Sequence, residues 1–292
     1  MSRTDLRPPP LPEPHWVDTQ SGLDRVVERL RSSNALVALD TETTLAGQHF
    51  CVLALVQVSD GDSVWLIDPL EVDPSPLLRL LFGAPWLPPI FHDASGDLMV
   101  LKRLYGRLPE AIIDTLLASQ ALGMGTPNLR FLTEHLLGWR MDKAPQQSNW
   151  LRRPLSDAQF EYAALDVFAL PHIERLIRRH VIDLDVEDVF QASCVSLLER
   201  LKAYEPPEVH PFEERFFRRH RDRPARMRLR RLLEWRTDEA NRGRIDILMG
   251  FGNETLARIA LQPPASARDL HAYLPGHLVE RYGRRVLRVL GG

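Results

Sequence analysis

Acidic residues in three distant segments constrain the fold and chemistry of this chain more than any other feature. Asp40 and Glu42 follow an apolar run in ALVALDTET, Asp97 lies in HDASGDL, and Asp166 ends YAALD, four residues after Tyr162. If these segments meet, the four carboxylates raise one another's pKa, because like charges oppose ionisation. Divalent cations remove that cost, and oxygen ligands of this kind select Mg²⁺ or Mn²⁺. Two such ions about 4 Å apart are the usual apparatus for cleaving phosphodiesters.

The first and third motifs each place two polar side chains on one face of an element. Asp40 and Glu42 are expected at the end of a strand. Side chains alternate along a strand with a period of two residues, so these two acids lie on the same side. A spacing of four along a helix does this for Tyr162 and Asp166. Taken separately, the first pair is typical of two solvated acids, and the second of a half-buried tyrosine beside a surface aspartate. All three motifs in this order favour one joint site, in which the phenol holds a water molecule or accepts its proton.

The second motif leaves a choice of ligand. A strand end, a turn and a helix start follow one another in HDASGDL. Ser95 could cap that helix, whose N-terminus favours acidic residues anyway. On the residues alone, either Asp93 or Asp97 could bind a metal ion. His92 is expected to form hydrogen bonds, since the carboxylates already supply the metal ligands.

Apolar patterns predict a mixed α/β domain followed by a helical one. Strands are expected at 35–41, 52–59, 64–68, 89–92 and 111–114, the first three antiparallel. Helices are expected at 74–82, 95–105, 115–122, 129–137, from 156 onward and at 186–201. This order gives a mixed sheet flanked by helices. After prolines at 206, 207 and 211, the predicted helices are 223–242, 254–262, 266–272 and 277–289. The predicted parts are a disordered lead-in at 1–14, a sheet domain at 15–205, a linker at 206–222 and a helical domain at 223–292.

Charge is distributed unevenly between the two predicted domains. Residues 1–205 hold 19 Lys and Arg against 28 Asp and Glu, whereas residues 206–292 hold 18 Arg against 11 acidic residues. An acidic first part suits a metal site, and a basic second part suits a polyanion. The densest basic stretch, Arg215 to Arg236, is either a salt-bridged helix face or a nucleic-acid surface. The fork of the guanidinium group favours phosphate contact.

Other features predict a cytoplasmic protein. The apolar runs fall short of the roughly 20 residues that a membrane span needs. The proline-rich N-terminus lacks the apolar region of a signal peptide. Cys51 and Cys194 lie far apart in apolar surroundings and are expected to be free, buried thiols.

Taken together, the three motifs resemble those of the ribonuclease D family, within the DEDD superfamily of 3′–5′ exonucleases. ALDTET, HDASGDL and YAALDV match its three exonuclease motifs, and Tyr162 places the chain with the tyrosine subgroup. The sequences around these motifs also resemble those of the family, in LVQVSDGDSVWLIDPL, IIDTLLASQALG and DKAPQQSNWLRRPLSDAQFEYAALDV. The resemblance covers roughly residues 15–205. It implies an α/β domain of the ribonuclease H-like fold, a mixed sheet flanked by helices.

The resemblance implies a role for each residue of the acidic motifs. Asp40 matches the aspartate that bridges both metal ions, and Glu42 matches the glutamate that binds the metal holding the water nucleophile. Asp97 matches the second-motif aspartate, five residues after the histidine, which makes it the preferred ligand of its segment. Asp166 matches the final metal ligand. Tyr162 matches the tyrosine that orients the attacking water.

Two positions depart from the family pattern, and both bear on substrate contacts. Thr43 replaces an aromatic residue after the glutamate, and Asn149 replaces the aspartate of an SDW element. Single-stranded ends can enter a narrow cleft, with bases stacking on aromatic side chains. The candidate substrate contacts are Thr41, Phe91, His92 and Trp150. For the two aromatic rings, a place in the core is an equally good expectation.

The basic segment resembles an HRDC domain, a small all-α module that follows the catalytic domain in this family. Its first helix and the segment that follows match LRRLLEWRTDEANRGRID. The rest of the module matches ETLARIALQPPASARDLHAYLPGHLVERYGRRVLRVL. The match spans about residues 223–290, as one module. In the family it aids RNA binding. The alternative is a helical bundle that merely packs on the nuclease.

These resemblances imply a metal-dependent 3′–5′ exoribonuclease. It would trim RNA 3′ ends, of tRNA precursors or other structured RNA, and release nucleoside 5′-monophosphates using two Mg²⁺ or Mn²⁺ ions. No membrane is involved, and a monomer is favoured. The alternatives are a 3′–5′ DNA exonuclease with the same site and a non-catalytic RNA-binding protein, against which the five intact residues argue. A phosphatase is disfavoured, because its nucleophile loop prefers aspartate in place of Glu42.

Overall fold

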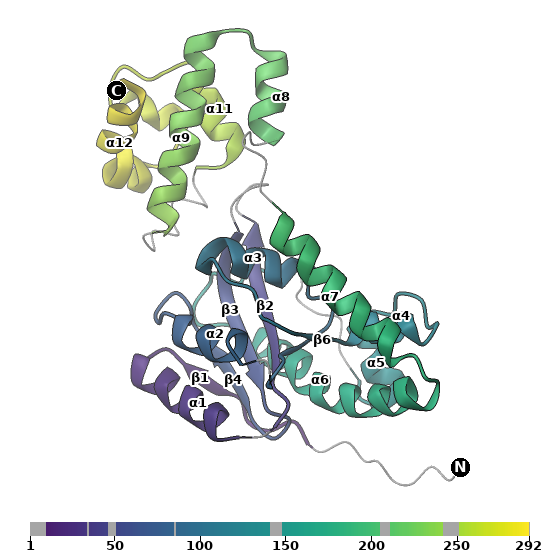
Figure 1. The fold of residues 1–292 in the computed structure, drawn as a ribbon. Helices are drawn as coiled ribbons and strands as arrows, with labels where there is room; N and C mark the ends of the chain where they lie inside the picture. Colours follow the sequence, from purple (N-terminus) through teal and green to yellow (C-terminus); the bar gives the residue numbers. More distant parts are fainter. Residues whose placement is uncertain are drawn as a thin grey trace. The chain divides into compact units, whose positions relative to one another are not determined.

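The structure is a computed structural model that describes residues 10–33, 35–45, 51–84, 86–140, 148–204, 211–241 and 251–291. These residues form two compact units, the first mostly within 10–204 and the second mostly within 211–291 (Figure 1). The predicted lead-in at 1–14 lies largely outside the described residues. No described helix combines the length and apolarity needed to cross a membrane.

A six-stranded mixed sheet forms the centre of the first unit. Its strands are β1 (His15–Val17), β2 (Ala38–Leu45), β3 (Cys51–Ser59), β4 (Val64–Ile67), β5 (Ile90–Phe91) and β6 (Ile113–Asp114). Their order across the sheet is β1-β4-β3-β2-β5-β6. Strands β3 and β4 are antiparallel, whereas β1 with β4, β2 with β5 and β5 with β6 are parallel. The predicted mixed sheet is therefore confirmed, with β1 added at one edge.

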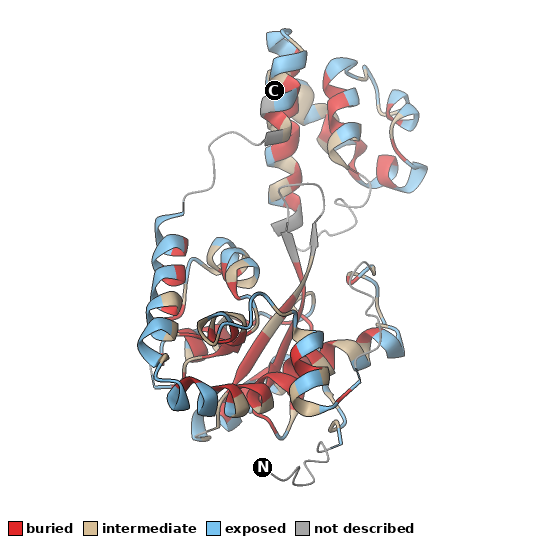
Figure 2. Cartoon of the chain, turned by 90° about the vertical axis from the view of Figure 1, so that its right-hand side faces the viewer, coloured by how far each residue is buried: buried red, intermediate tan, exposed pale blue. Residues whose placement is uncertain are grey.

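Helices cover both faces of this sheet, so that alternate strand residues enter two different cores (Figure 2). On strand β4, Val64 and Leu66 face one core, while Trp65 and Ile67 face the other. The helices of the unit are α1 (Gln20–Ser32), α2 (Ser75–Phe82), α3 (Ser95–Tyr105), α4 (Thr115–Ala121), α5 (Leu129–Leu132), the π-helical turn η1 (Thr133–Leu137), α6 (Asp157–Asp183) and α7 (Glu187–Ala203). This alternation follows directly from the period of two along a strand.

Two local features fix the ends of the long helices α6 and α7. Ser156 and Gln159 form a reciprocal capping box at the start of α6. At the end of α7, the Nζ of Lys102 donates hydrogen bonds to the carbonyl oxygens of Leu201, Lys202 and Tyr204, at 2.7, 3.0 and 2.9 Å. These carbonyls have no partner within a helix, so Lys102 supplies a C-terminal cap from a different element.

The second unit is helical, as predicted, with one correction. It contains α8 (Pro211–Arg219), α9 (Arg223–Asn241), α11 (Asn253–Leu261), the 3₁₀ turn η2 (Asp269–Ala272) and α12 (Gly276–Gly291). The linker predicted at 206–222 thus includes a helix. Pro211 stands at the first position of that helix, where a missing N–H costs nothing. Phe216 of α8 is 5% exposed and belongs to the core of this unit.

Four arginines of the basic stretch hold the second unit together. Arg226 donates to the carbonyl oxygens of His220 and Phe217, and Arg228 donates to that of Ala260. Arg230 pairs with Glu213 at 2.5 Å. Arg236 is fully buried and donates to the carbonyl oxygen of Phe251 and to Asn253. The alternative of an internally paired basic helix is therefore correct for part of the stretch.

Candidate active site

Strand β2, helix α3 and helix α6 bring the predicted acids together. The ligand oxygens of Asp40, Glu42 and Asp166 all lie within 4.8 Å of one another. Asp97 lies outside this group of three, but it accepts a hydrogen bond from the hydroxyl of Thr41. The charge of Asp40 also acts on Asp97. The three remote segments therefore meet, and the acids Asp40, Glu42, Asp97 and Asp166 are called the acidic cluster below.

The position of the first pair differs slightly from the prediction. Strand β2 runs from Ala38 to Leu45, so Asp40 and Glu42 lie within the strand rather than at its end. Both side chains are half-buried, while Thr41 between them is buried. The alternation of a strand thus directs the two acids to one side and Thr41 to the other.

Burial and mutual repulsion oppose ionisation throughout the acidic cluster. Burial, followed by the charge of Asp166, raises the pKa of Asp40 to about 7. Burial, followed by repulsion from Asp40, Asp166 and Asp97, raises the pKa of Glu42 to about 9. The pKa of Asp97 rises well above its usual value through burial and the charge of Asp40. Burial raises the pKa of Asp166 to about 7, although a hydrogen bond from Tyr162 lowers it.

The acidic cluster fits a divalent cation. Its ligand atoms are all carboxylate oxygens, and hard cations such as Mg²⁺ prefer such ligands. None of the described lysines or arginines contributes to the shifted pKa values of these acids. The negative charge that accumulates on ionisation is therefore not neutralised by the described part of the protein. A cation bound from solution would neutralise it.

Tyr162 lies at the edge of the acidic cluster on helix α6. The phenol is half-buried and hydrogen-bonded to Asp166, one turn further along the same helix. Its ring lies 6.2 Å from that of Trp150, in a tilted arrangement. Ala163 and Ala164, between the two polar residues, are both fully buried. Their small side chains let this part of α6 pack closely against the sheet, so that its polar face reaches the acids of β2.

The structure distinguishes between the two aspartates of HDASGDL. Asp93 is exposed, has a φ of 61° and accepts a hydrogen bond of 3.1 Å from the hydroxyl of Ser95. Asp97, in the first turn of α3, interacts with Thr41 and Asp40. The expected capping by Ser95 is not observed, because the first residue before α3 is Ala94 and no side chain caps the helix. The geometry therefore favours Asp97 over Asp93 as a metal ligand.

Asp114, which was not among the residues predicted from the sequence, positions this segment. Its carboxylate is 1% exposed and accepts hydrogen bonds from the backbone N–H groups of Asp93, Ala94 and Leu116, at 3.2, 2.9 and 2.8 Å. One side chain thus fixes both the turn before α3 and the start of α4. The available signal was an aspartate that follows the apolar residues of β6 and precedes a helix, which is the usual position of an N-cap.

The stacking role considered for two aromatic residues is wrong in this structure. Phe91 is 0% exposed and Trp150 is 1% exposed, and each lies in one of the two cores of the first unit. Neither ring has a face on which a base could stack. The reason is that β5 is an interior strand and that Trp150 packs beneath the start of α6, as the equally good alternative expected.

Thr41 and His92 form hydrogen bonds to other side chains. Thr41 donates to Asp97, which gives it a role in positioning that acid. The Nδ1 of His92 lies 2.9 Å from the hydroxyl of Thr115, and burial lowers the pKa of the imidazole. Asn149, one of the two departures from the family pattern, accepts a hydrogen bond of 3.1 Å from the N–H of Leu151. An aspartate could accept the same bond, so the turn at this position survives the replacement.

Comparison with known proteins adds independent findings. Residues 14–182, which include all five residues of the three motifs, match a family described as 3′–5′ exonuclease. Residues 225–290 match the HRDC domain. The ribonuclease D of Haemophilus influenzae is 31% identical over 89% of this chain and 66% of its own length. That of Xanthomonas oryzae pv. oryzae is 31% identical over 89% of this chain and 70% of its own length. This chain thus spans about two thirds of the length of each of these two relatives.

Two solved structures resemble the chain. Escherichia coli RNase D, described as an exoribonuclease involved in structured RNA processing, has a TM-score of 0.62 at 27% identity, over 96% of this chain and 74% of its own. Brucella melitensis NrnC with bound Mg²⁺ has a TM-score of 0.54 at 26% identity, over 68% of this chain and 98% of its own. The second structure was solved with the type of cation that suits the acidic cluster.

Proposed function

This chain belongs to the ribonuclease D family of 3′–5′ exonucleases, and from that premise we propose that it hydrolyses RNA from the 3′ end and releases nucleoside 5′-monophosphates. The observation that supports the proposal most is the acidic cluster itself. Four acids from three remote segments lie together with raised pKa values and no internal counter-charge among the described residues. Such an arrangement destabilises the folded protein, but it suits the metal-assisted cleavage of a phosphodiester.

The acids would hold two divalent cations, Mg²⁺ or Mn²⁺. When bound, these ions stabilise negative charge on the entering and leaving oxygens of a phosphodiester. Asp40 would be the central ligand, and Glu42, Asp97 and Asp166 would hold the ions with it. Thr41 holds Asp97 in position through its hydroxyl. The bound Mg²⁺ in the Brucella melitensis relative supports the choice of metal.

Tyr162 would orient the attacking water. Its hydroxyl group is held by Asp166, so the phenol has a fixed direction at the edge of the acidic cluster. A positioned water needs less reorganisation to reach the phosphorus atom in line with the leaving oxygen. A side chain positioned for general acid–base catalysis typically raises the reaction rate by about 10²–10⁴-fold, and we expect the contribution of Tyr162 to the rate not to exceed this range.

The second unit would bind RNA phosphates in a groove between α8 and α11. The groove has a volume of about 360 Å³ and is lined by Phe212, Arg215, Phe216, Arg219, His220, Glu254, Ala257, Arg258 and Leu261. Three of these residues are arginines on the exposed surface, and one is an acid. They are different residues from Arg226, Arg228, Arg230 and Arg236, although Arg258 also donates a hydrogen bond to the carbonyl oxygen of Ala272. The natural substrates would be tRNA precursors or other structured RNAs with a single-stranded 3′ end.

A salt titration tests the contribution of this groove. The Arg219→Gln variant is expected to bind RNA less tightly, with a slope of log affinity against log salt that is shallower by about 0.7–0.9, the value for one phosphate contact. Arg284→Gln is the matched control, because Arg284 is an exposed arginine of the same unit that does not line the groove. Equal slopes for Arg219→Gln and the parent would remove the groove from the RNA path.

Digestion of 3′-labelled oligonucleotides tests the activity. With Mg²⁺ or Mn²⁺, the protein is expected to shorten RNA stepwise from its 3′ end and to release 5′-monophosphates, and EDTA should abolish the reaction. A DNA oligonucleotide of the same sequence distinguishes an exoribonuclease from a DNA exonuclease. Faster cleavage of the DNA would reassign the substrate, and RNA binding without mononucleotide release would indicate a non-catalytic RNA-binding protein.

A further inference from the structure

A second pocket in the first unit lies apart from the acidic cluster. It has a volume of about 310 Å³, within the range of small-molecule sites, and lies among β6, α4, α6 and α7. None of the residues of the acidic cluster, nor Tyr162, lines it. Its walls are mostly apolar and include Ile112, Ile113, Ala118, Ile177, Val181 and Leu198. The pocket could therefore enclose the body of an apolar molecule.

One polar side chain in this pocket is buried without a full set of partners. Glu174 of α6 is 4% exposed, and its Oε1 accepts a hydrogen bond from the Nε of Arg178. Its Oε2 is buried, and no donor from the described residues reaches it. Buried carboxylate oxygens nearly always accept hydrogen bonds, because desolvation without a donor is costly. An unsatisfied oxygen of this kind in the wall of a pocket indicates that a bound ligand donates a hydrogen bond to it.

The charges around the pocket define the ligand further. The ionisable carboxyl groups in its lining are those of Glu110, Glu174 and Glu187, against one guanidinium, that of Arg178. Cys194 is a free, buried cysteine, and burial raises the pKa of its thiol to about 12. The thiol is thus neutral and unreactive near pH 7. An excess of acids repels phosphates, so the pocket is unsuited to the RNA substrate.

We propose that the pocket among β6, α4, α6 and α7 binds a small organic cation with an apolar body, whose ammonium group donates a hydrogen bond to the Oε2 of Glu174. The body of the ligand lies against the apolar walls, and the exposed acids of the lining, Glu110 and Glu187, attract its charge. A charged donor suits a carboxylate oxygen better than a neutral one, because charge-assisted hydrogen bonds are stronger. This site is independent of the proposed exonuclease activity.

Three probes of nearly equal shape and different charge test the proposal. They are 4-phenylbutylamine, 4-phenylbutan-1-ol and 4-phenylbutyrate, titrated into the full chain in EDTA without RNA and followed by NMR or calorimetry. The amine is expected to bind at least about tenfold more tightly than the alcohol, since an ionic partner roughly doubles the strength of a hydrogen bond. The acid is expected to bind least. Equal binding of the three probes, stronger binding of the acid, or no binding of the amine would overturn the proposal.

Substitutions locate the site. Glu174→Gln preserves the shape of the side chain and is expected to remove the preference for the amine while leaving the affinity for the alcohol unchanged. Val195→Trp adds bulk to an exposed residue of the pocket lining and should weaken the binding of all probes. Val189→Trp is the matched control, because Val189 is equally exposed on the same helix but outside the lining. Equal effects of the two tryptophan variants would show that the amine binds elsewhere.

A competition experiment separates this site from the substrate path. An RNA oligonucleotide added to the amine complex is expected to leave the affinity for the amine unchanged. Displacement of the amine by RNA would show that the pocket belongs to the RNA path and would overturn the proposal. All of these measurements are made on binding alone, so a failure of the exonuclease hypothesis would leave their interpretation intact.

Discussion

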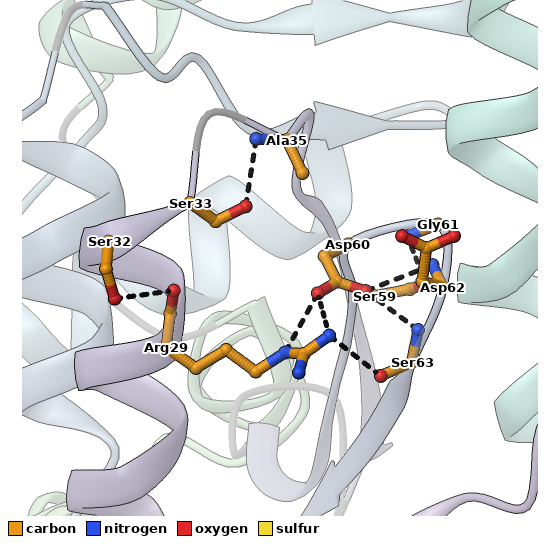
Figure 3. A network of polar contacts seen from close by, with 9 residues as sticks. All are labelled: Arg29, Ser32, Ser33, Ala35, Ser59, Asp60, Gly61, Asp62 and Ser63. Atoms are coloured by element: carbon orange, nitrogen blue, oxygen red, sulfur yellow. Dashed lines mark hydrogen bonds and ion pairs between the residues drawn. The ribbon is translucent and has the colours of Figure 1, made fainter.

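Two sets of acids in the first unit differ in how their negative charge is compensated. One set is paired with arginines of the fold, and the other is not. Asp60 is 4% exposed, and its Oδ2 accepts hydrogen bonds from the Nε and Nη2 of Arg29, at 3.1 and 3.0 Å. Its Oδ1 accepts from the N–H groups of Asp62 and Ser63 (Figure 3). Asp68 is 2% exposed and is held by the Nε and Nη2 of Arg153, at 2.6 and 2.7 Å. These two acids carry their counter-charge within the fold.

The acidic cluster has no such internal partner among the described residues. Burial raises the pKa of each of its members, and repulsion adds to the rise for Asp40, Glu42 and Asp97, whereas hydrogen bonds offset only part of the rise for Asp40, Asp97 and Asp166. Acids that are wholly or partly withdrawn from water therefore have two outcomes in this fold. An acid that is paired with an arginine fixes a turn or holds a loop, and an acid without such a pair is available to a cation from solution. The predictions below test this distinction.

The largest effect is expected from Asp40→Asn. The substitution removes the central ligand and should reduce the rate of RNA hydrolysis by about 10³-fold or more, because metal ions contribute several kcal/mol to such reactions. In metal-free protein at pH 8 the same change should raise the free energy of unfolding, since it removes an unpaired buried charge. Single-turnover digestion and urea unfolding measure the two effects. A folded variant that trims RNA at the parent rate would exclude the proposed site.

The second effect concerns the stability of the metal-free protein. Asp40 and Asp166 ionise near pH 3.8 in the unfolded chain and near pH 7 in the fold. Between these values the folded state binds more protons, so the free energy of unfolding falls as the pH rises from about 4 to about 7. One such shift corresponds to about 4 kcal/mol.

Urea unfolding in EDTA across this pH range checks the prediction. Added Mg²⁺ or Mn²⁺ should restore stability above pH 7 and have little effect near pH 4.5, where the acids are protonated. Asp40→Asn should have a shallower pH dependence than the parent. A metal-free protein that becomes more stable between pH 4.5 and 7 would contradict the assignment of these acids.

Asp68→Asn is expected to act on stability alone. It removes the charge that pairs with Arg153, which is only 23% exposed, and should lower the free energy of unfolding by about 2–3 kcal/mol. Hydrolysis by the folded molecules should continue at the parent rate. Asp157→Asn, at an exposed position, is the control and should change stability by less than about 0.5 kcal/mol. A gain in stability for Asp68→Asn would remove the distinction between the two sets of acids.

The smallest effect is expected from Tyr162→Phe, with a loss of about 10–100-fold in rate. The substitution also removes the hydrogen bond that lowers the pKa of Asp166, so that pKa rises. The acidic limb of the pH–rate profile should therefore move to higher pH. Tyr273→Phe is the control, since its hydroxyl donates to the carbonyl oxygen of Gln262 in the second unit. An unchanged rate would exclude Tyr162 from the reaction, and a rate loss without a shift of the profile would show that the phenol acts without changing the pKa of Asp166.

Local patterns predicted most of the fold and the candidates Asp40, Glu42 and Asp166, whereas Asp97 was preferred over Asp93 only through the resemblance to the family. Helix α3 begins and ends where its apolar spacing and the following Gly106 indicate. Helix α1 was missed, although Leu23, Val26, Val27 and Leu30 have helical spacing and Thr19 caps the helix. That signal was available in the sequence. Strand β1 has only three residues, too few for a periodic pattern, and is defined by its pairing with β4.

Other features depend on packing between distant segments and have no local signal. The burial of Phe91 and Trp150 follows from the helices that cover the sheet, which the residues alone do not specify. The role of Asp114 depends on the approach of the turn before α3 to the start of α4. Sequence motifs thus predicted the candidate reactive groups, while Asp114, which positions their neighbourhood, was recognised only from the structure.

Lys102 has a consequence for chemical labelling of this protein. The chain contains only three lysines, at 102, 143 and 202. The ammonium group of Lys102 is bonded to three carbonyl oxygens at the end of α7, and an amine-reactive ester needs that nitrogen deprotonated and uncovered. Acylation of this nitrogen therefore requires the last turn of α7 to open first. The rate at which Lys102 is acylated therefore measures how often the last turn of α7 frays, where the chain leaves the sheet-containing unit.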